Sequence, residues 1–166
     1  MSRKDWADWD GLQEEVLARY ACTQNLVLHG PEHWRRVEVI GLSMARECGA
    51  DPTVVRLFAW LHDACRLNDD TDDGHGRRSA ELVRALRSEY FSIGERSFRQ
   101  LCEACHYHAD GLTTTDPTIG VCWDADRLDL PRVGIMPETH LMSTAAGRDL
   151  AAGLRSGPGS FFWSDS

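Results

Sequence analysis

Residues 51–66 read DPTVVRLFAWLHDACR, and this stretch decides the fold. Asp51 followed by Pro52 is typical of a helix start, because aspartate caps free backbone N–H groups and proline fits the first turn. Apolar residues then recur every three or four positions, which places them on one helix face: Val54, Phe58, Leu61 and Cys65. The sequence therefore predicts a helix over residues 51–66 with one buried face.

The rest of the chain shows the same periodicity and almost no strand-like alternation, so the predicted fold class is all-α, a single-domain helical bundle. Further helices are expected over residues 10–28, 31–49, 75–90, 92–108 and 116–130. We expect residues 1–27 to form an N-terminal helix packed on the same domain and residues 28–146 to form the main helical domain. A flexible C-terminal tail is expected over residues 147–166.

Charge and hydrophobicity argue against some classes of function. The chain has 166 residues, with 18 basic and 26 acidic side chains and a net charge of −8, which disfavours general binding to nucleic acid. Its longest apolar run, residues 57–61, is far too short to cross a bilayer. Without a secretory signal pattern, a cytoplasmic location is expected. The six cysteines are expected to be reduced and mostly buried, and the oligomeric state is left open.

Histidines and carboxylates occupy the predicted apolar faces of five helices. His33 shares a face with apolar residues of its helix, His62 lies beside Phe58 and Leu61, and the same holds for three more polar residues: His75, His108 and Asp126. Burying several such groups costs several kcal/mol unless they are paired, and a divalent cation pairs with all of them at once. A buried hydrogen-bonded network without metal is the alternative.

Three motifs together resemble the HD-domain superfamily of metal-dependent phosphohydrolases. They are His33 within HWRRV, the pair His62-Asp63 within LHD, and DADRLD at residues 124–129. The resemblance covers residues 28–130 and implies an HD-type helical fold with four metal ligands: His33, His62, Asp63 and Asp126. Helical phase and the family's alanine-aspartate pattern favour Asp126 over Asp124. Asp124 and Asp129 are then expected to support ligands or cap helices.

The resemblance also implies further site residues. His75 and His108 are similar to positions that in some relatives hold a second metal or the substrate phosphate, and His106 and His29 are weaker candidates. The predicted catalytic set is Asp63, His75, His108 and Arg66. Many relatives carry an acidic catalytic residue where this chain has Arg66 and Leu67, so Arg66 is expected to hold phosphate instead. Arg36 and Arg127 are further phosphate candidates, the acidic loop 69–73 offers a substitute carboxylate, and His140 is expected at the surface.

The function implied is hydrolysis of a phosphate ester by a metal-activated water, with a small, nucleotide-like phosphorylated substrate as partner. The cofactor is a divalent metal ion, Mn, Fe, Zn, Ni or Mg, with one ion implied and a second possible. Two alternatives stay open. One is a non-catalytic metal- or nucleotide-binding module, which the departure at Arg66 favours, and the other is a di-iron oxygenase of the same superfamily.

Overall fold

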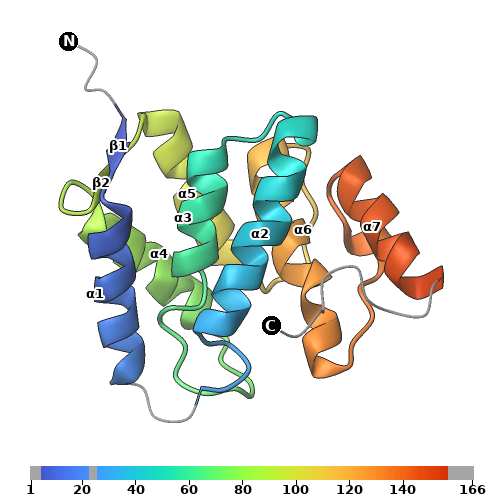
Figure 1. Ribbon diagram of the computed structural model, residues 1–166, viewed down its shortest axis with the longest axis horizontal. Coiled ribbons are helices and arrows are strands. Elements are labelled where there is room, and N and C mark those ends of the chain that lie inside the picture. The colour runs from blue at the N-terminus through green and yellow to red at the C-terminus, as the bar shows by residue number, and fades with distance from the viewer. Residues whose placement is uncertain (1–4, 23–25, 157–166) are drawn as a thin grey trace.

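The structure is a computed structural model that describes residues 5–22 and 26–156 (Figure 1). Seven α-helices make up most of this part of the chain, with two short 3-10 helices and two very short strands. In chain order the elements are β1 (Trp6–Ala7), α1 (Trp9–Ala21), α2 (Pro31–Cys48), α3 (Pro52–Leu61), α4 (His75–Leu86), β2 (Phe91–Ser92), α5 (Glu95–Tyr107), α6 (Pro117–Leu128), η1 (Leu130–Val133), η2 (Thr139–Leu141) and α7 (Ala145–Ser156). The predicted all-α fold class is confirmed.

The helix boundaries follow local chemistry. The Asp51 carboxylate accepts hydrogen bonds from the backbone N–H groups of Thr53 and Val54 at the start of α3, and Asp116 caps α6 in the same way. Gly49 ends α2 in the left-handed conformation at φ +68°, which glycine adopts without steric cost. The aspartate–proline starts predicted from sequence are therefore present.

Helix α3 is the centre of the bundle, packed between α2, α5 and α6. Nearly all of its side chains are buried, and a single apolar core surrounds it, to which α1 contributes Leu12 and Val16. Figure 1 shows α1 and α7 at opposite sides of the molecule, flanking the central helices. The residues that follow α3, His62 and Asp63, are thereby enclosed on several sides.

Several element boundaries differ from the sequence-based ones. Helix α1 ends at Ala21 rather than near residue 28, and α4 ends at Leu86 rather than residue 90. After α4 the chain turns through Ser88 at φ +71°, and residues 91–92 pair antiparallel with residues 6–7. This small sheet escaped prediction because two-residue strands carry no detectable alternation.

The expected flexible tail from residue 147 is wrong for its first ten residues, because α7 spans Ala145–Ser156. Ala146, Leu150 and Leu154 pack against the core at helical spacing, and the Thr144 hydroxyl accepts a hydrogen bond from the Gly147 N–H. These tertiary contacts outweigh the weak helix propensity of a glycine-containing segment. Residues 157–166 of the expected tail lie outside the described residues.

Gly76 allows α4 to lie close to the end of α5. A Cβ atom added there would lie 2.3 Å from the His106 carbonyl oxygen, which is main chain and cannot swing away. We expect Gly76→Ala to destabilise the protein by about 1–3 kcal/mol, which lowers Tm by several degrees in thermal unfolding. Gly153→Ala in α7 is the matched control, since its Cβ meets nothing within 4 Å, and it should stabilise slightly. Equal Tm shifts would contradict the close approach.

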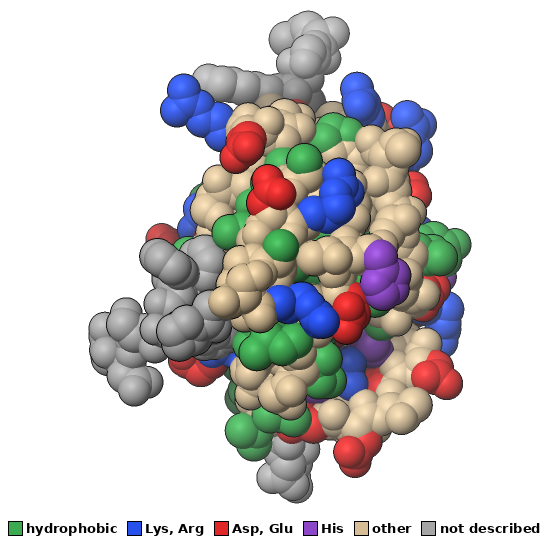
Figure 2. All heavy atoms as spheres, turned by 90° about the vertical axis from the view of Figure 1, so that its right-hand side faces the viewer, with side chains coloured by type: hydrophobic (Ala, Val, Ile, Leu, Met, Phe, Trp, Pro, Cys, Tyr) green, Lys and Arg blue, Asp and Glu red, His purple; other side chains and the backbone are tan. Residues whose placement is uncertain are grey.

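Among the described residues no helix is both long and apolar enough to span a membrane. The face shown in Figure 2 mixes acidic, basic and apolar side chains rather than presenting one broad charge. The six cysteines are free thiols, and Cys102, Cys105 and Cys122 are buried in the helical core, so the expectation of reduced, mostly core-facing cysteines is met for these three.

Candidate metal centre

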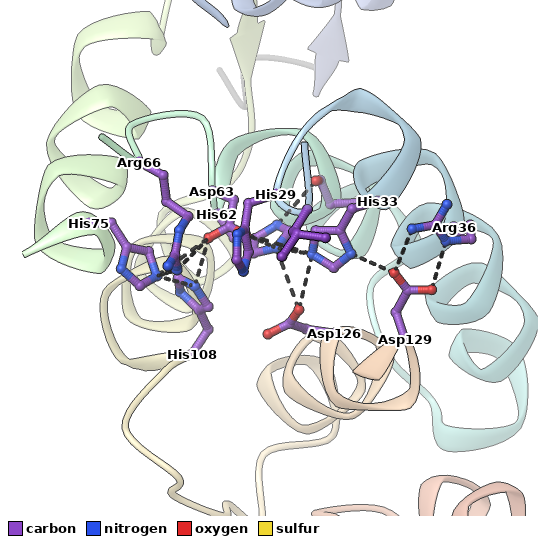
Figure 3. Close-up of polar contacts among 12 residues, drawn as sticks. His29, His33, Arg36, His62, Asp63, Arg66, His75, His108, Asp126 and Asp129 are labelled. Carbon is purple, nitrogen blue, oxygen red and sulfur yellow. Dashed lines mark hydrogen bonds and ion pairs between the residues drawn. The ribbon is translucent and has the colours of Figure 1, made fainter. Parts of the chain in front are cut away.

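The four predicted metal ligands come from three separate segments and converge in the interior (Figure 3). His33 lies in the first turn of α2, His62 is the residue that ends α3, Asp63 follows it, and Asp126 lies in the last turn of α6. His33, His62 and Asp63 are almost completely buried, whereas the side chain of Asp126 is 19% exposed. Solvent therefore reaches the cluster at Asp126.

The donor atoms of this cluster lie within reach of a single ion. The His33 Nε2 atom is 3.1 Å from His62 Nε2 and 3.2 Å from Asp126 Oδ1, and Asp63 Oδ2 lies 3.7 and 3.6 Å from the two imidazole nitrogens. His33, His62 and Asp126 each offer one ligand atom, all within 4.8 Å of one another. The set combines imidazole and carboxylate, a mixture suited to transition metals.

Hydrogen bonds on the far side of each ring direct its Nε2 atom into the cluster. His62 Nδ1 donates to the carbonyl oxygens of Phe58 and Ala59, and His33 Nδ1 lies 2.6 Å from Asp129 Oδ2. A neutral imidazole protonated at Nδ1 has only a lone pair at Nε2. Two such lone pairs facing each other at 3.1 Å repel unless both bind a cation or one ring takes up a second proton. The donor set thus fits a metal ion.

A second donor set adjoins the first through Asp63. Its Oδ1 atom lies 3.4 Å from His75 Nε2 and 3.3 Å from His108 Nε2, and those two nitrogens are 2.9 Å apart. Here too each Nδ1 contacts a backbone carbonyl, that of Asp72 for His75 and that of Cys105 for His108. The two Asp63 oxygens therefore face two clusters of imidazole nitrogens.

The electrostatics of the cluster follow from burial and mutual contact. Burial lowers the pKa of His62 to about 4, because a charged imidazole loses its hydration there. Burial also opposes ionisation of Asp63 and Asp126, but the surrounding histidines outweigh it and lower both carboxyl pKa values. For His33 and His108 burial acts against protonation, and contacts with the carboxylates still raise their pKa. Ionised carboxylates and a neutral His62 are the forms that bind metal.

Residues 31–136 match the family model described as the HD domain, nearly two thirds of the chain. The chain belongs to the HD domain family. A solved structure with a similar fold is a predicted HD superfamily hydrolase from an uncultured Thermotogales bacterium, at 22% identity and a TM-score of 0.71. That alignment covers 90% of this chain and 86% of the other. The predicted family is thus confirmed, and the HD domain contains His/Asp clusters that could hold a metal ion.

Asp129 orients His33, the first of the predicted ligands. It is fully buried, contacts His33 Nδ1, and receives hydrogen bonds from Arg36 Nε at 2.9 Å and Nη2 at 3.2 Å. Arg132 adds an ion pair at 3.5 Å. Such a carboxylate fixes the tautomer of a ligating histidine and keeps Nε2 directed at the metal.

We therefore expect Asp129→Asn to weaken metal affinity of the HD domain roughly 10- to 100-fold, measured by isothermal titration calorimetry with Mn²⁺. The exposed residue Asp149 on α7 provides the matched control, since Asp149→Asn removes the same charge away from the cluster. An unchanged affinity in Asp129→Asn would mean that His33 is oriented by packing alone.

Arg66 lies at the second donor set, whereas Arg127 does not. The Arg66 Nη1 atom is 3.4 Å from His75 Nε2 and 3.9 Å from Asp63 Oδ1, while Nε and Nη2 donate to the carbonyls of Asn68 and Asp70. Arg127 instead donates to the carbonyls of Leu141 and Leu112, so the phosphate-binding expectation for it is wrong. Its guanidinium thereby holds the chain at residues 112 and 141 against α6.

The remaining sequence candidates have structural roles. Asp124 accepts hydrogen bonds from the Ser143 and Thr144 N–H groups and secures the segment before α7, so it caps rather than supports a ligand. In the acidic loop, Asp69 binds the backbone N–H groups of residues 27–28 and the His29 ring, and Asp72 pairs with Arg78. His140 is exposed, as expected.

Two positioning residues escaped the sequence-based reasoning. Arg132 supports Asp129, and its spacing of three residues after that aspartate was a usable signal, because i,i+3 residues are neighbours in a helical turn. Asp72 supports His75 through its backbone carbonyl, a contact available to any residue type. His29, rated low from sequence, lies near the cluster, with its ring centroid 6.2 Å from that of His33.

Proposed function

We propose that this HD domain is a metal-dependent phosphohydrolase that cleaves a phosphate ester of a nucleotide or another small phosphorylated molecule. The proposal rests on one observation. Imidazole rings whose Nδ1 atoms are already hydrogen-bonded to oxygen point their Nε2 atoms at the carboxylates of Asp63 and Asp126. A donor set of this kind is suited to a cation, and the Asp126 side chain, 19% exposed, keeps it in contact with solvent. Membership of the HD family supports the same assignment.

His33, His62, Asp63 and Asp126 would hold the ion. A divalent cation in that position supplies Lewis-acid chemistry, since it lowers the pKa of water and polarises a phosphoryl oxygen. Asp129, Arg36 and Arg132 keep His33 directed at the centre. The buried walls around His62 exclude bulk water, which strengthens electrostatic interactions with an anionic substrate.

Arg66 and the pair His75–His108 would act on the substrate. The Arg66 guanidinium is held by two backbone carbonyls with Nη1 directed at the second donor set, so it can neutralise phosphate charge. His108 lies against Asp63, a contact that raises its pKa, so that it can carry a proton. In its protonated form it can donate that proton to the leaving oxygen.

The test is a turnover screen with added Mn²⁺, Fe²⁺, Zn²⁺, Ni²⁺ or Mg²⁺ over nucleotides, cyclic dinucleotides, alarmones and sugar phosphates. We expect hydrolysis of at least one phosphate ester that a chelator abolishes and added metal restores. If the protein binds metal tightly but hydrolyses none of these compounds, the phosphohydrolase proposal is wrong and a non-catalytic binding module replaces it.

Oxygenation at a di-iron pair is a second candidate, favoured by the two donor sets on either side of Asp63. Aerobically purified protein would then contain two iron ions per chain and show visible absorbance. Elemental analysis and an absorption spectrum separate this candidate from the hydrolase, for which phosphate-ester turnover with a redox-inert metal is the expected result.

A further inference from the structure

The loops next to the metal centre expose large apolar side chains. Of the ten large hydrophobic residues exposed among the described residues, six lie in four loops: residues 26–30 before α2, 62–74 after α3, 108–116 after α5 and 129–138 after α6. Their exposed fractions range from 41% for Leu28 to 80% for Val27. We call these six residues the apolar rim: Val27, Leu28, Leu67, Leu112, Ile135 and Met136.

Charged side chains fix the backbone of three of these loops. The Asp69 carboxylate accepts hydrogen bonds from the Val27 and Leu28 N–H groups at 2.7 and 3.2 Å. Asp72 accepts from the Leu67 N–H at 3.0 Å, and Arg127 donates to the Leu112 carbonyl at 2.6 Å. A backbone held in this way keeps its apolar side chains at the surface instead of letting them turn inward.

The fourth loop is linked to the first by an arginine. Arg132 donates from Nε to the Leu28 carbonyl at 3.1 Å while pairing with Asp129, the carboxylate behind His33. The start of α2, the loop after α3 and the end of α6 accordingly lie at one end of the bundle, at the bottom of Figure 1. Three of the rim loops are therefore hydrogen-bonded to one another, and the fourth, at residues 108–116, is held by Arg127 of α6.

Two of the rim residues are chain neighbours of residues at or beside the site. Leu67 follows Arg66, whose Nη1 atom is 3.4 Å from His75 Nε2, and Leu28 precedes His29. Arg127, which holds the Leu112 loop, follows Asp126, the ligand through which solvent reaches the cluster. Because consecutive Cα atoms are only about 3.8 Å apart, the backbone at Leu28 and Leu67 lies beside the site, and a group extending outward past Arg66 would meet this part of the rim.

We propose that the apolar rim binds the organic part of the substrate, so that the substrate is a phosphate ester carrying an apolar or aromatic group. This inference rests on the proposed function, which places the phosphate at the cation and Arg66. The substituent must then extend toward solvent past the rim, where contact with it removes apolar surface from water. A bare sugar phosphate would leave that surface exposed.

The experiment compares two non-hydrolysable probes, phenylphosphonate and methylphosphonate, by isothermal titration calorimetry on Mn²⁺-loaded protein. We expect phenylphosphonate to bind roughly tenfold or more tightly, from the apolar area that it buries. The double variant Leu67→Asn/Leu112→Asn should lose most of that preference while methylphosphonate affinity stays unchanged. Leu42→Asn is the matched control, an exposed leucine on α2 that lies outside the rim, and it should keep the preference.

The outcomes distinguish failure of the rim inference from failure of the proposed function. Equal affinity for the two phosphonates overturns the rim inference and leaves the phosphohydrolase proposal standing. Failure of both to bind the metal-loaded protein counts against the phosphate site and removes the rim inference with it. If light scattering shows a dimer that the double variant converts to a monomer, the rim is a contact between copies of the chain and the inference is overturned.

Discussion

Replacing Asp63 with asparagine should lower the proposed phosphate-ester hydrolysis by roughly 1,000-fold or more and reduce the amount of metal that the protein binds. Asp63 uses both oxygens, one toward His33 and His62 and the other toward His75 and His108. An amide has a single oxygen and no charge, so one donor set loses its carboxylate and the bound cation loses a counter-charge. Turnover under saturating metal, together with metal content by mass spectrometry, measures both effects.

Asp149→Asn provides the control for the loss of charge, since Asp149 is exposed on α7. It should retain full metal content and turnover. Circular dichroism must show that Asp63→Asn is folded, which we expect because the two side chains have the same shape. Retention of more than about a tenth of the activity in Asp63→Asn would contradict the central position given to this carboxylate.

The second large effect is on stability, for Phe58→Ala. Phe58 is completely buried, and its ring stacks on His62 with 4.7 Å between centroids and meets His108 edge-on at 6.1 Å. Removing the ring creates a cavity at the centre of the bundle, and we expect a loss of about 3–5 kcal/mol in the free energy of unfolding. Tm should fall by roughly 10 °C, measured by calorimetry on metal-free protein.

Phe58→Leu tests whether the loss of stability comes from the lost side-chain volume or from any change at this position. It fills much of the same volume and should recover more than half of the lost stability. Val39→Ala, at a position on α2 that is 61% exposed, should change the free energy of unfolding by less than about 0.5 kcal/mol. A similar loss in Val39→Ala and Phe58→Ala would show that burial around α3 does not govern stability.

The helices that could be predicted are those whose signals lie within the segment itself. Asp51-Pro52 and Asp116-Pro117 mark starts through local hydrogen bonding and restricted backbone angles, so neighbouring elements are not needed to find them. Helix α7 was missed because its stability comes from docking, through Leu150 and the Asp124 contacts at its start. A contact between residues 19 or more positions apart leaves no trace in local periodicity.

Site residues could be predicted from the sequence where their position in a helix determines which face their side chains occupy. Phase distinguished Asp126 from Asp124, and the structure places Asp126 at His33 while Asp124 secures the start of α7. Phase could not show the direction of Arg127, because a long side chain bends away from the face that bears its Cα atom. Nor could it find loop contacts such as that between Arg132 and Leu28.

Three of the imidazoles are held at Nδ1 by peptide oxygens, those of Phe58 and Ala59, Asp72 and Cys105. A change of side chain at those supporting positions leaves the peptide oxygen in place. In a saturation mutagenesis experiment, substitutions at the supports of His62, His75 and His108 should act through lost packing, as at the buried Phe58, and not through loss of the hydrogen bond to the ring. The support of His33 is a side chain, so position 129 should accept almost nothing else.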